Sequence, residues 1–146
     1  MNPLASLTHA EQPVRRLAET GATRTAGPRI AHCARPCPTC PWRVDTAHRI
    51  AYPNVAEYAA DTIGEPGREA PIGAPMFACH AIDLVPGWLC SGWLAIVGQH
   101  HLTVRYAVAI GALPAAALAP RRGWPELFPT YQAMETAHRH ALTETL

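Results

Sequence analysis

The chain contains no lysine: all 12 of its basic residues are arginine, against 11 acidic residues. Charged residues make up only 16% of the 146 positions, and the formal net charge is +1. Non-specific binding to nucleic acid needs a broad basic face. This charge balance therefore argues against a protein that coats nucleic acid.

A long apolar run is also missing. The longest apolar stretch, residues 102–119, is interrupted by Arg105 and Pro114 and is largely alanine, which makes it a poor membrane span. Residues 1–9 lack the basic start and apolar run of a secretory signal. We therefore expect a cytoplasmic protein with no membrane contact, in which cysteines stay reduced.

Regular structure is not expected at the start of the chain. About thirty residues rich in Pro, Thr, Ala, Gly and Arg show little periodicity, apart from a short helix predicted over Val14–Thr20. The whole chain is 49% hydrophobic, enough for one compact core. These features predict a disordered tail over residues 1–31 and a single domain over residues 32–146.

Five cysteines are present, and two of them lie in the motif Cys37-Pro38-Thr39-Cys40-Pro41-Trp42-Arg43. Two thiols spaced C-x-x-C on a turn stiffened by proline can converge on one tetrahedral metal ion. Two further thiols follow in the stretches Phe77-Ala78-Cys79-His80 and Cys90-Ser91-Gly92-Trp93-Leu94. The sequence therefore predicts a metal site made by Cys37, Cys40, Cys79 and Cys90.

The chemistry of these thiols leaves alternatives open. Four thiolates suit a structural Zn²⁺, and they also suit a [4Fe-4S] cluster in a redox-sensing protein. A redox-active dithiol is less favoured, because the βαβ context of thioredoxin-like proteins does not follow the motif. The cysteines can also be buried small hydrophobes with no ligand. We favour zinc.

Other cysteine and histidine residues are assigned no ligand role. Cys33 completes the spacing C-x3-C-x2-C of radical-SAM enzymes, but their barrel needs far more chain than is present. His80 is expected beside the ligands or on the surface, because neighbouring side chains of an extended segment point in opposite directions. The pairs His100-His101 and His138/His140 are expected on the surface.

A zinc-dependent nucleobase or nucleoside deaminase is a further hypothesis. His9-Ala10-Glu11 and the later Pro36-Cys37-Pro38-Thr39-Cys40 fit the pattern H-x-E…P-C-x-x-C. In that chemistry His9, Cys37 and Cys40 hold zinc and Glu11 transfers protons. The context argues against it, since only eight residues precede His9 and no apolar strand precedes the cysteine pair.

Helical signals dominate the rest of the chain. Asn54 and Glu57 form a predicted capping box for a helix over residues 55–63. Ser91 is the predicted N-cap of a second helix, and two more are expected over residues 102–113 and 129–142. A short strand over residues 76–78 is expected to deliver Cys79 to the site. The predicted fold is mostly α, with a small α+β fold as the alternative, stapled by the metal.

The three cysteine-bearing stretches resemble an uncharacterised family of actinobacterial and phage proteins, a domain of unknown function, over roughly residues 32–113. The resemblance implies that the four cysteines belong to one constellation and that His9 and Glu11 lie outside it. We expect a small, non-enzymatic metal-binding protein that acts as an interaction or regulatory module. Its expected partner is a protein or a nucleic acid. Arg35, Arg43 and Arg49, which cluster around the site with Trp42, could contact such a partner, but the favoured interpretation is that these arginines are solvated.

Overall fold

The structure is a computed structural model that describes residues 28–50, 52–79 and 87–145. These residues form five α-helices, three short 3-10 helices and isolated β-bridges, with no strand among them. The prediction of a mostly α fold is confirmed. In chain order the elements are α2 (Val44–Ala47), α3 (Val55–Ala59), η1 (Ala60–Thr62), α4 (Ser91–Val97), η2 (Gly98–His100), α5 (Leu102–Ala109), η3 (Ala115–Leu118) and α6 (Tyr131–Thr145).

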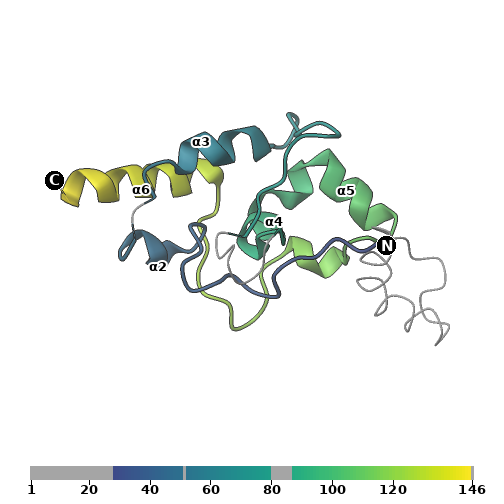
Figure 1. Cartoon of the computed structure of the whole chain (residues 1–146), viewed down its shortest axis with the longest axis horizontal. Helices are drawn as coiled ribbons and strands as arrows, with labels where there is room; N and C mark the ends of the chain where they lie inside the picture. The colour runs from purple at the N-terminus through teal and green to yellow at the C-terminus, as the bar shows by residue number, and fades with distance from the viewer. Residues whose placement is uncertain (1–27, 51, 80–86, 146) are drawn as a thin grey trace, which may run out of the picture.

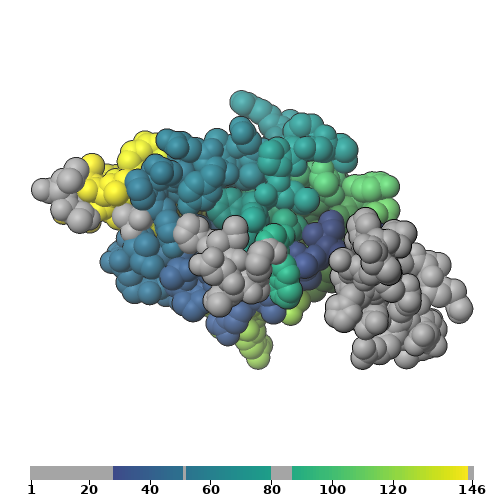
Figure 2. Space-filling view, in the orientation of Figure 1, coloured from purple at the N-terminus to yellow at the C-terminus, as the bar shows by residue number. Residues whose placement is uncertain are grey.

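The helices are arranged around α4. Figure 1 shows α2, α3 and α6 gathered at one end, α5 at the other, and α4 between them. Both α2 and α3 pack against α6, while η3 packs against α4. In the space-filling view, the C-terminal helix forms one end of the folded part (Figure 2). None of the helices formed by the described residues is long and apolar enough to cross a bilayer.

Helix α4 forms the centre of the core. Trp93 and Leu94 are fully buried, and the indole N–H of Trp93 donates to the hydroxyl of Thr62 at 3.1 Å. The predicted N-cap, Ser91, is wrong by one residue. Cys90 has the extended backbone of an N-cap, and its Sγ accepts the Trp93 amide at 3.5 Å. The helix therefore begins directly after a predicted ligand.

The other predicted helices form near their expected positions, but their lengths differ from the prediction. Asn54 is the N-cap of α3, but its side chain makes no cap hydrogen bond, so the predicted capping box does not form. Helical backbone continues through η1 to Thr62, close to the predicted end. Helix α5 begins at the predicted residue and stops before Gly111, whose φ of +81° breaks the helix.

Two histidines contradict the surface prediction. His101 and His138 are fully buried, and each places its Nε2 against a backbone carbonyl. His101 lies 3.0 Å from the oxygen of Pro75, and His138 lies 2.8 Å from the oxygen of Pro41. Because each ring satisfies a carbonyl in a proline-containing loop, these histidines are structural. His140 is exposed, as predicted.

Candidate functional site

A three-segment arrangement lies next to the start of α4. Its middle segment, residues 88–90, pairs on both sides through Leu89: with His32 in a parallel bridge and with Ala78 in an antiparallel bridge. The predicted strand over residues 76–78 is therefore reduced to a single bridge. It nevertheless brings the residue that follows it, Cys79, beside the middle segment.

The register of these bridges places three cysteines on one face. The amides of Cys33, Cys79 and Cys90 donate across the segments at 3.0, 2.6 and 3.0 Å, to the carbonyls of Leu89, Trp88 and Phe77 respectively. Side chains alternate along extended backbone, and residues in register share a face. Cys33, Cys79 and Cys90 therefore project from the face opposite to Leu89.

The C-x-x-C turn completes the cluster. Its amide at Cys40 donates to the carbonyl of Cys37 at 3.0 Å, which closes the turn. The sulfur of Cys40 lies 3.6 Å from that of Cys90, and both residues are buried. The five cysteines are joined by no disulfide. The turn thus brings the thiol of Cys40 into contact with the thiol of Cys90, fifty positions later in the chain.

The thiols perturb one another. A hydrogen bond with Cys40 is the main reason that the pKa of Cys37 falls to about 5, while the same contact holds the pKa of Cys40 well above its usual value. Burial and the neighbouring Cys79 raise the pKa of Cys33 to about 12. A hydrogen bond with Cys79 also contributes to the lowered pKa of Cys37. Through these interactions the thiols follow one another in a row, in the order Cys33, Cys79, Cys37, Cys40, Cys90.

This row of thiols does not form a closed metal site. Across the part of the protein that the structure describes, no group of three or more His, Cys, Asp or Glu side chains is arranged to hold a metal ion. The four predicted ligands are nevertheless in one neighbourhood. Cys33, which the sequence reasoning left without a role, belongs there too. The spacing C-x3-C-x2-C of Cys33, Cys37 and Cys40 was the one feature of the sequence that could have assigned Cys33 to the cluster.

Side chains from residues 43–52 hold the outer side of the turn. Three successive carbonyls each accept a side-chain hydrogen bond: that of residue 37 from Arg43 at 3.2 Å, that of residue 38 from Arg49 at 2.7 Å, and that of residue 39 from Tyr52 at 2.5 Å. Arg43 also forms an ion pair with Asp45, which is the main reason that its pKa is raised. The turn is therefore fixed by its own downstream sequence.

The inner side of the turn is closed by Gly92 and Trp42. A Cβ atom at Gly92 would lie 2.9 Å from the Cβ of Trp42 and 3.1 Å from the Sγ of Cys40, so only glycine allows this approach. Trp42 is fully buried and packs edge-on against Phe77, with ring centroids 5.8 Å apart. Trp42 therefore belongs to the core.

Three residues of the earlier hypotheses lie outside the described residues. These are His9 and Glu11 of the deaminase pattern and His80 beside Cys79. The predicted tail helix over Val14–Thr20 lies outside them as well.

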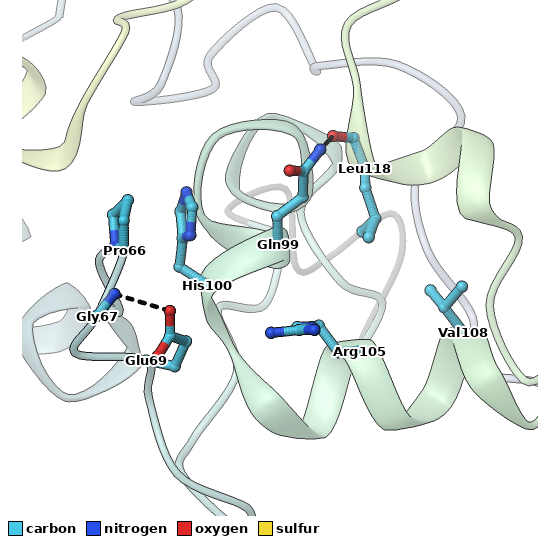
Figure 3. Close-up of a pocket in the computed structure, with 8 residues that line it drawn as sticks. All are labelled: Pro66, Gly67, Glu69, Gln99, His100, Arg105, Val108 and Leu118. Atoms are coloured by element: carbon cyan, nitrogen blue, oxygen red, sulfur yellow. Dashed lines mark hydrogen bonds between the residues drawn. The ribbon is translucent and has the colours of Figure 1, made fainter.

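A cavity of about 470 Å³ lies apart from the cysteines. It is bordered by the backbone around Pro66 and by the start of α5, and Figure 3 shows Arg105 extending across it. Glu69 accepts the Gly67 amide at 2.9 Å, which is the main reason that its pKa is lowered. No cysteine lines this cavity, whose border is made by Pro66, Gly67, Glu69, Gln99, His100, Arg105, Val108 and Leu118. The cavity is therefore a separate feature from the cysteine cluster.

Comparison with known proteins identifies the family. A family model, described as a family of unknown function (DUF6283), matches residues 32–145. No curated protein and no solved structure matches the chain. The matched range contains all five cysteines and every helix described above. The chain belongs to this family of unknown function, as its cysteine-bearing stretches predicted.

Proposed function

We propose that this protein is a metal-binding domain in which Cys37, Cys40, Cys79 and Cys90 hold one structural Zn²⁺. The observation that carries the proposal is the 3.6 Å separation of the sulfurs of Cys40 and Cys90. A zinc–sulfur bond of about 2.3 Å places neighbouring sulfurs of a tetrahedral site about 3.8 Å apart. Two of the ligands thus already have the spacing that one shared ion requires.

The two other interpretations of buried cysteines fit less well. A disulfide bond is about 2.05 Å long, much shorter than the separation between Cys40 and Cys90. Inert cysteines would behave as small hydrophobes, with protonated thiols. The hydrogen bond with Cys40 instead lowers the pKa of Cys37 to about 5 and favours its thiolate, which is the form that binds metals. The same bond raises the pKa of Cys40, which would release its proton when a metal binds.

The sulfur spacing also favours zinc over an iron–sulfur cluster. In a [4Fe-4S] cluster each cysteine binds a different iron, so the cysteine sulfurs lie farther apart than those sharing one ion. The contact between Cys40 and Cys90 suits a single shared ion. The cluster is retained as an alternative outcome of the metal analysis below.

A metal at this position would cross-link segments of the chain that also pack together in the hydrophobic core. The ligands come from the turn at residues 37–40, from residue 79 and from the start of α4. Binding energy at such a site adds directly to folding stability. We propose that this fixed domain serves a protein or nucleic acid partner as an interaction module, in a reducing compartment where the thiols persist.

Cobalt binding tests the ligand set. Co²⁺ in a tetrahedral thiolate site gives intense sulfur-to-metal absorption and visible bands, whereas Co²⁺ bound to oxygen ligands gives only weak absorption. The metal-free full chain should develop the intense bands at one equivalent of Co²⁺, and Zn²⁺ should abolish them. Cys40→Ser and Cys90→Ser should lose most of the sulfur band.

The matched control for these variants is Arg105→Gln. Arg105 lies in the separate cavity, so its loss should leave the cobalt spectrum unchanged. Weak bands in the wild type, or full bands in Cys40→Ser and Cys90→Ser, would contradict the four-cysteine site.

A further inference from the structure

The cavity beside α5 is bordered by a loop that the backbone holds in place. Residues 64–70 pair with the junction between η2 and α5: the Ala70 amide donates to the carbonyl of His100 at 2.9 Å, and the Leu102 amide donates to the carbonyl of Ala70 at 2.8 Å. A Cβ atom at Gly64 would collide with the His100 carbonyl, so only glycine allows this approach. The cavity of about 470 Å³ is therefore part of the fold, and its volume is typical of a small-molecule site.

Two opposite charges border this cavity without pairing. The guanidinium of Arg105 and the carboxylate of Glu69 both line it, and Arg105 extends toward the side on which Glu69 and His100 lie (Figure 3). Within the described part of the chain, neither Arg105 nor Glu69 forms an ion pair. A ligand in the cavity would therefore meet a cationic group and an anionic group at one end.

The other end of the cavity is apolar. Val108 of α5 and Leu118 of η3 line it, and Figure 3 shows both side chains away from Glu69. The side-chain amide of Gln99 donates to the carbonyl of Leu118 at 3.3 Å, which ties η3 to η2. The fold thus fixes an aliphatic wall opposite the charged end.

We infer that this cavity binds a free aliphatic α-amino acid, of which leucine is an example. The guanidinium of Arg105 pairs with the ligand carboxylate through two hydrogen bonds, and Glu69 pairs with the ligand ammonium. Val108 and Leu118 contact the aliphatic side chain. The cavity is separate from the cysteines, so the inference does not depend on the proposed metal centre.

The two charges select the class of ligand. An α-amino acid carries its ammonium and its carboxylate on one carbon atom, whereas the end of a peptide carries only one of them. A simple carboxylate or a phosphate would place its negative charge near Glu69 without pairing it, and such a mismatch disfavours the wrong ligand. A free amino acid satisfies both side chains at once.

A titration of the wild-type full chain, followed by its amide NMR spectrum, tests the ligand class. L-Leucine at millimolar concentrations should shift the amide signals of Gly67, Glu69 and Arg105. Leucinamide lacks the carboxylate and N-acetyl-leucine lacks the ammonium. Each should bind at least about tenfold more weakly than leucine, because each loses one charged hydrogen-bonding group.

Substitutions at the charged end test the two pairs separately. Arg105→Gln and Glu69→Gln should each weaken leucine binding by about tenfold or more. Arg68→Gln and Glu57→Gln are the matched controls, since both residues are exposed and neither lines the cavity. They should bind leucine as the wild type does, and the amide spectrum of each free variant reports whether it is folded.

The titration on the wild type decides the inference even if a variant does not fold. No shift of the cavity amides with leucine would overturn it. N-Acetyl-leucine binding as tightly as leucine would overturn the role of Glu69 and the amino-acid class, and leucinamide doing so would overturn the role of Arg105. Metal content is measured independently, so leucine binding by a chain without zinc would contradict the proposed function and support this inference.

Discussion

At the scale of single residues, Gly92 decides how closely α4 approaches the cysteine turn. Replacing it with alanine forces a methyl group against Trp42 and the sulfur of Cys40. Overpacking of this kind costs about 1–3 kcal/mol. We expect Gly92→Ala to lower the free energy of unfolding by about that amount and to weaken zinc binding, measured by urea denaturation and chelator competition.

Gly98→Ala is the matched control for Gly92→Ala. Both glycines have helical backbone, but a Cβ at Gly98 meets the movable side-chain ends of Leu118, Val104 and Leu94. Gly98→Ala should leave zinc binding unchanged. Equal effects of the two substitutions on zinc binding would show that the close approach of Gly92 to Cys40 does not matter.

His138 predicts a dependence of stability on pH. Burial lowers its pKa below the ordinary value, even though its contact with the Pro41 carbonyl acts in the opposite direction. Just below about pH 6.5, His138 is therefore protonated in the unfolded chain but still mostly neutral in the folded chain. The stability that depends on neutral His138 is complete above this pH and is lost as the pH falls towards the folded-state pKa.

The variant His138→Gln isolates this contribution. Between about pH 7.5 and about pH 5.5 its unfolding free energy should fall less steeply than that of the wild type. Acid release of metal affects both proteins, so the difference between the slopes reports residue 138. Parallel slopes would refute a titrating role for this histidine.

Residue identity alone predicted the cysteines better than the histidines. The C-x-x-C spacing and the flanking aromatic residues marked Cys37, Cys40, Cys79 and Cys90, which the fold brings into one neighbourhood. The burial of His101 and His138 depends on carbonyls 26 and 97 positions away in the chain. No local pattern contains that information. Cys33 was missed because its register with Cys90 arises only from a long-range bridge.

At the scale of elements, the cysteine turn is maintained by side chains on its outer surface. The hydroxyl of Tyr52 donates to the carbonyl of Thr39 at 2.5 Å. One such hydrogen bond contributes about 1 kcal/mol. Tyr52→Phe should lower the free energy of unfolding by about this amount and speed zinc transfer to a chelator.

Tyr106→Phe is the matched control for Tyr52→Phe, because Tyr106 is 59% exposed on α5. It should match the wild type in both unfolding and zinc transfer. If Tyr52→Phe also behaves as the wild type, the outer hydrogen bonds do not maintain the turn.

Helix positions were predictable where apolar residues recur over two turns. This holds for α4, α5 and α6, whose apolar residues Trp93, Val104 and Met134 are fully buried. The four-residue helices α2 and η3 were not predicted, since one turn is too short for a periodic pattern. The capping box at Asn54 failed because its side chain makes no bond to the first-turn amides.

At the scale of the whole molecule, the proposed ligands connect the turn at residues 37–40 with Cys79 and with Cys90 at the start of α4. The segments that carry them are also joined by isolated bridges, by hydrogen bonds and by the packing of Trp42, Phe77 and Trp93 in the core. Removal of a structural ion with a chelator should therefore lower the thermal midpoint markedly, and added zinc should restore it. A midpoint that does not respond to either treatment would argue against a metal staple.

Metal content of the anaerobically purified wild type, measured together with its visible spectrum, tests the central claim most directly. The proposed site predicts about one zinc per chain in a colourless protein. Several irons with sulfide and a brown colour would replace zinc with a cluster. A protein that contains no metal, or that carries a disulfide between Cys40 and Cys90, would contradict the metal centre.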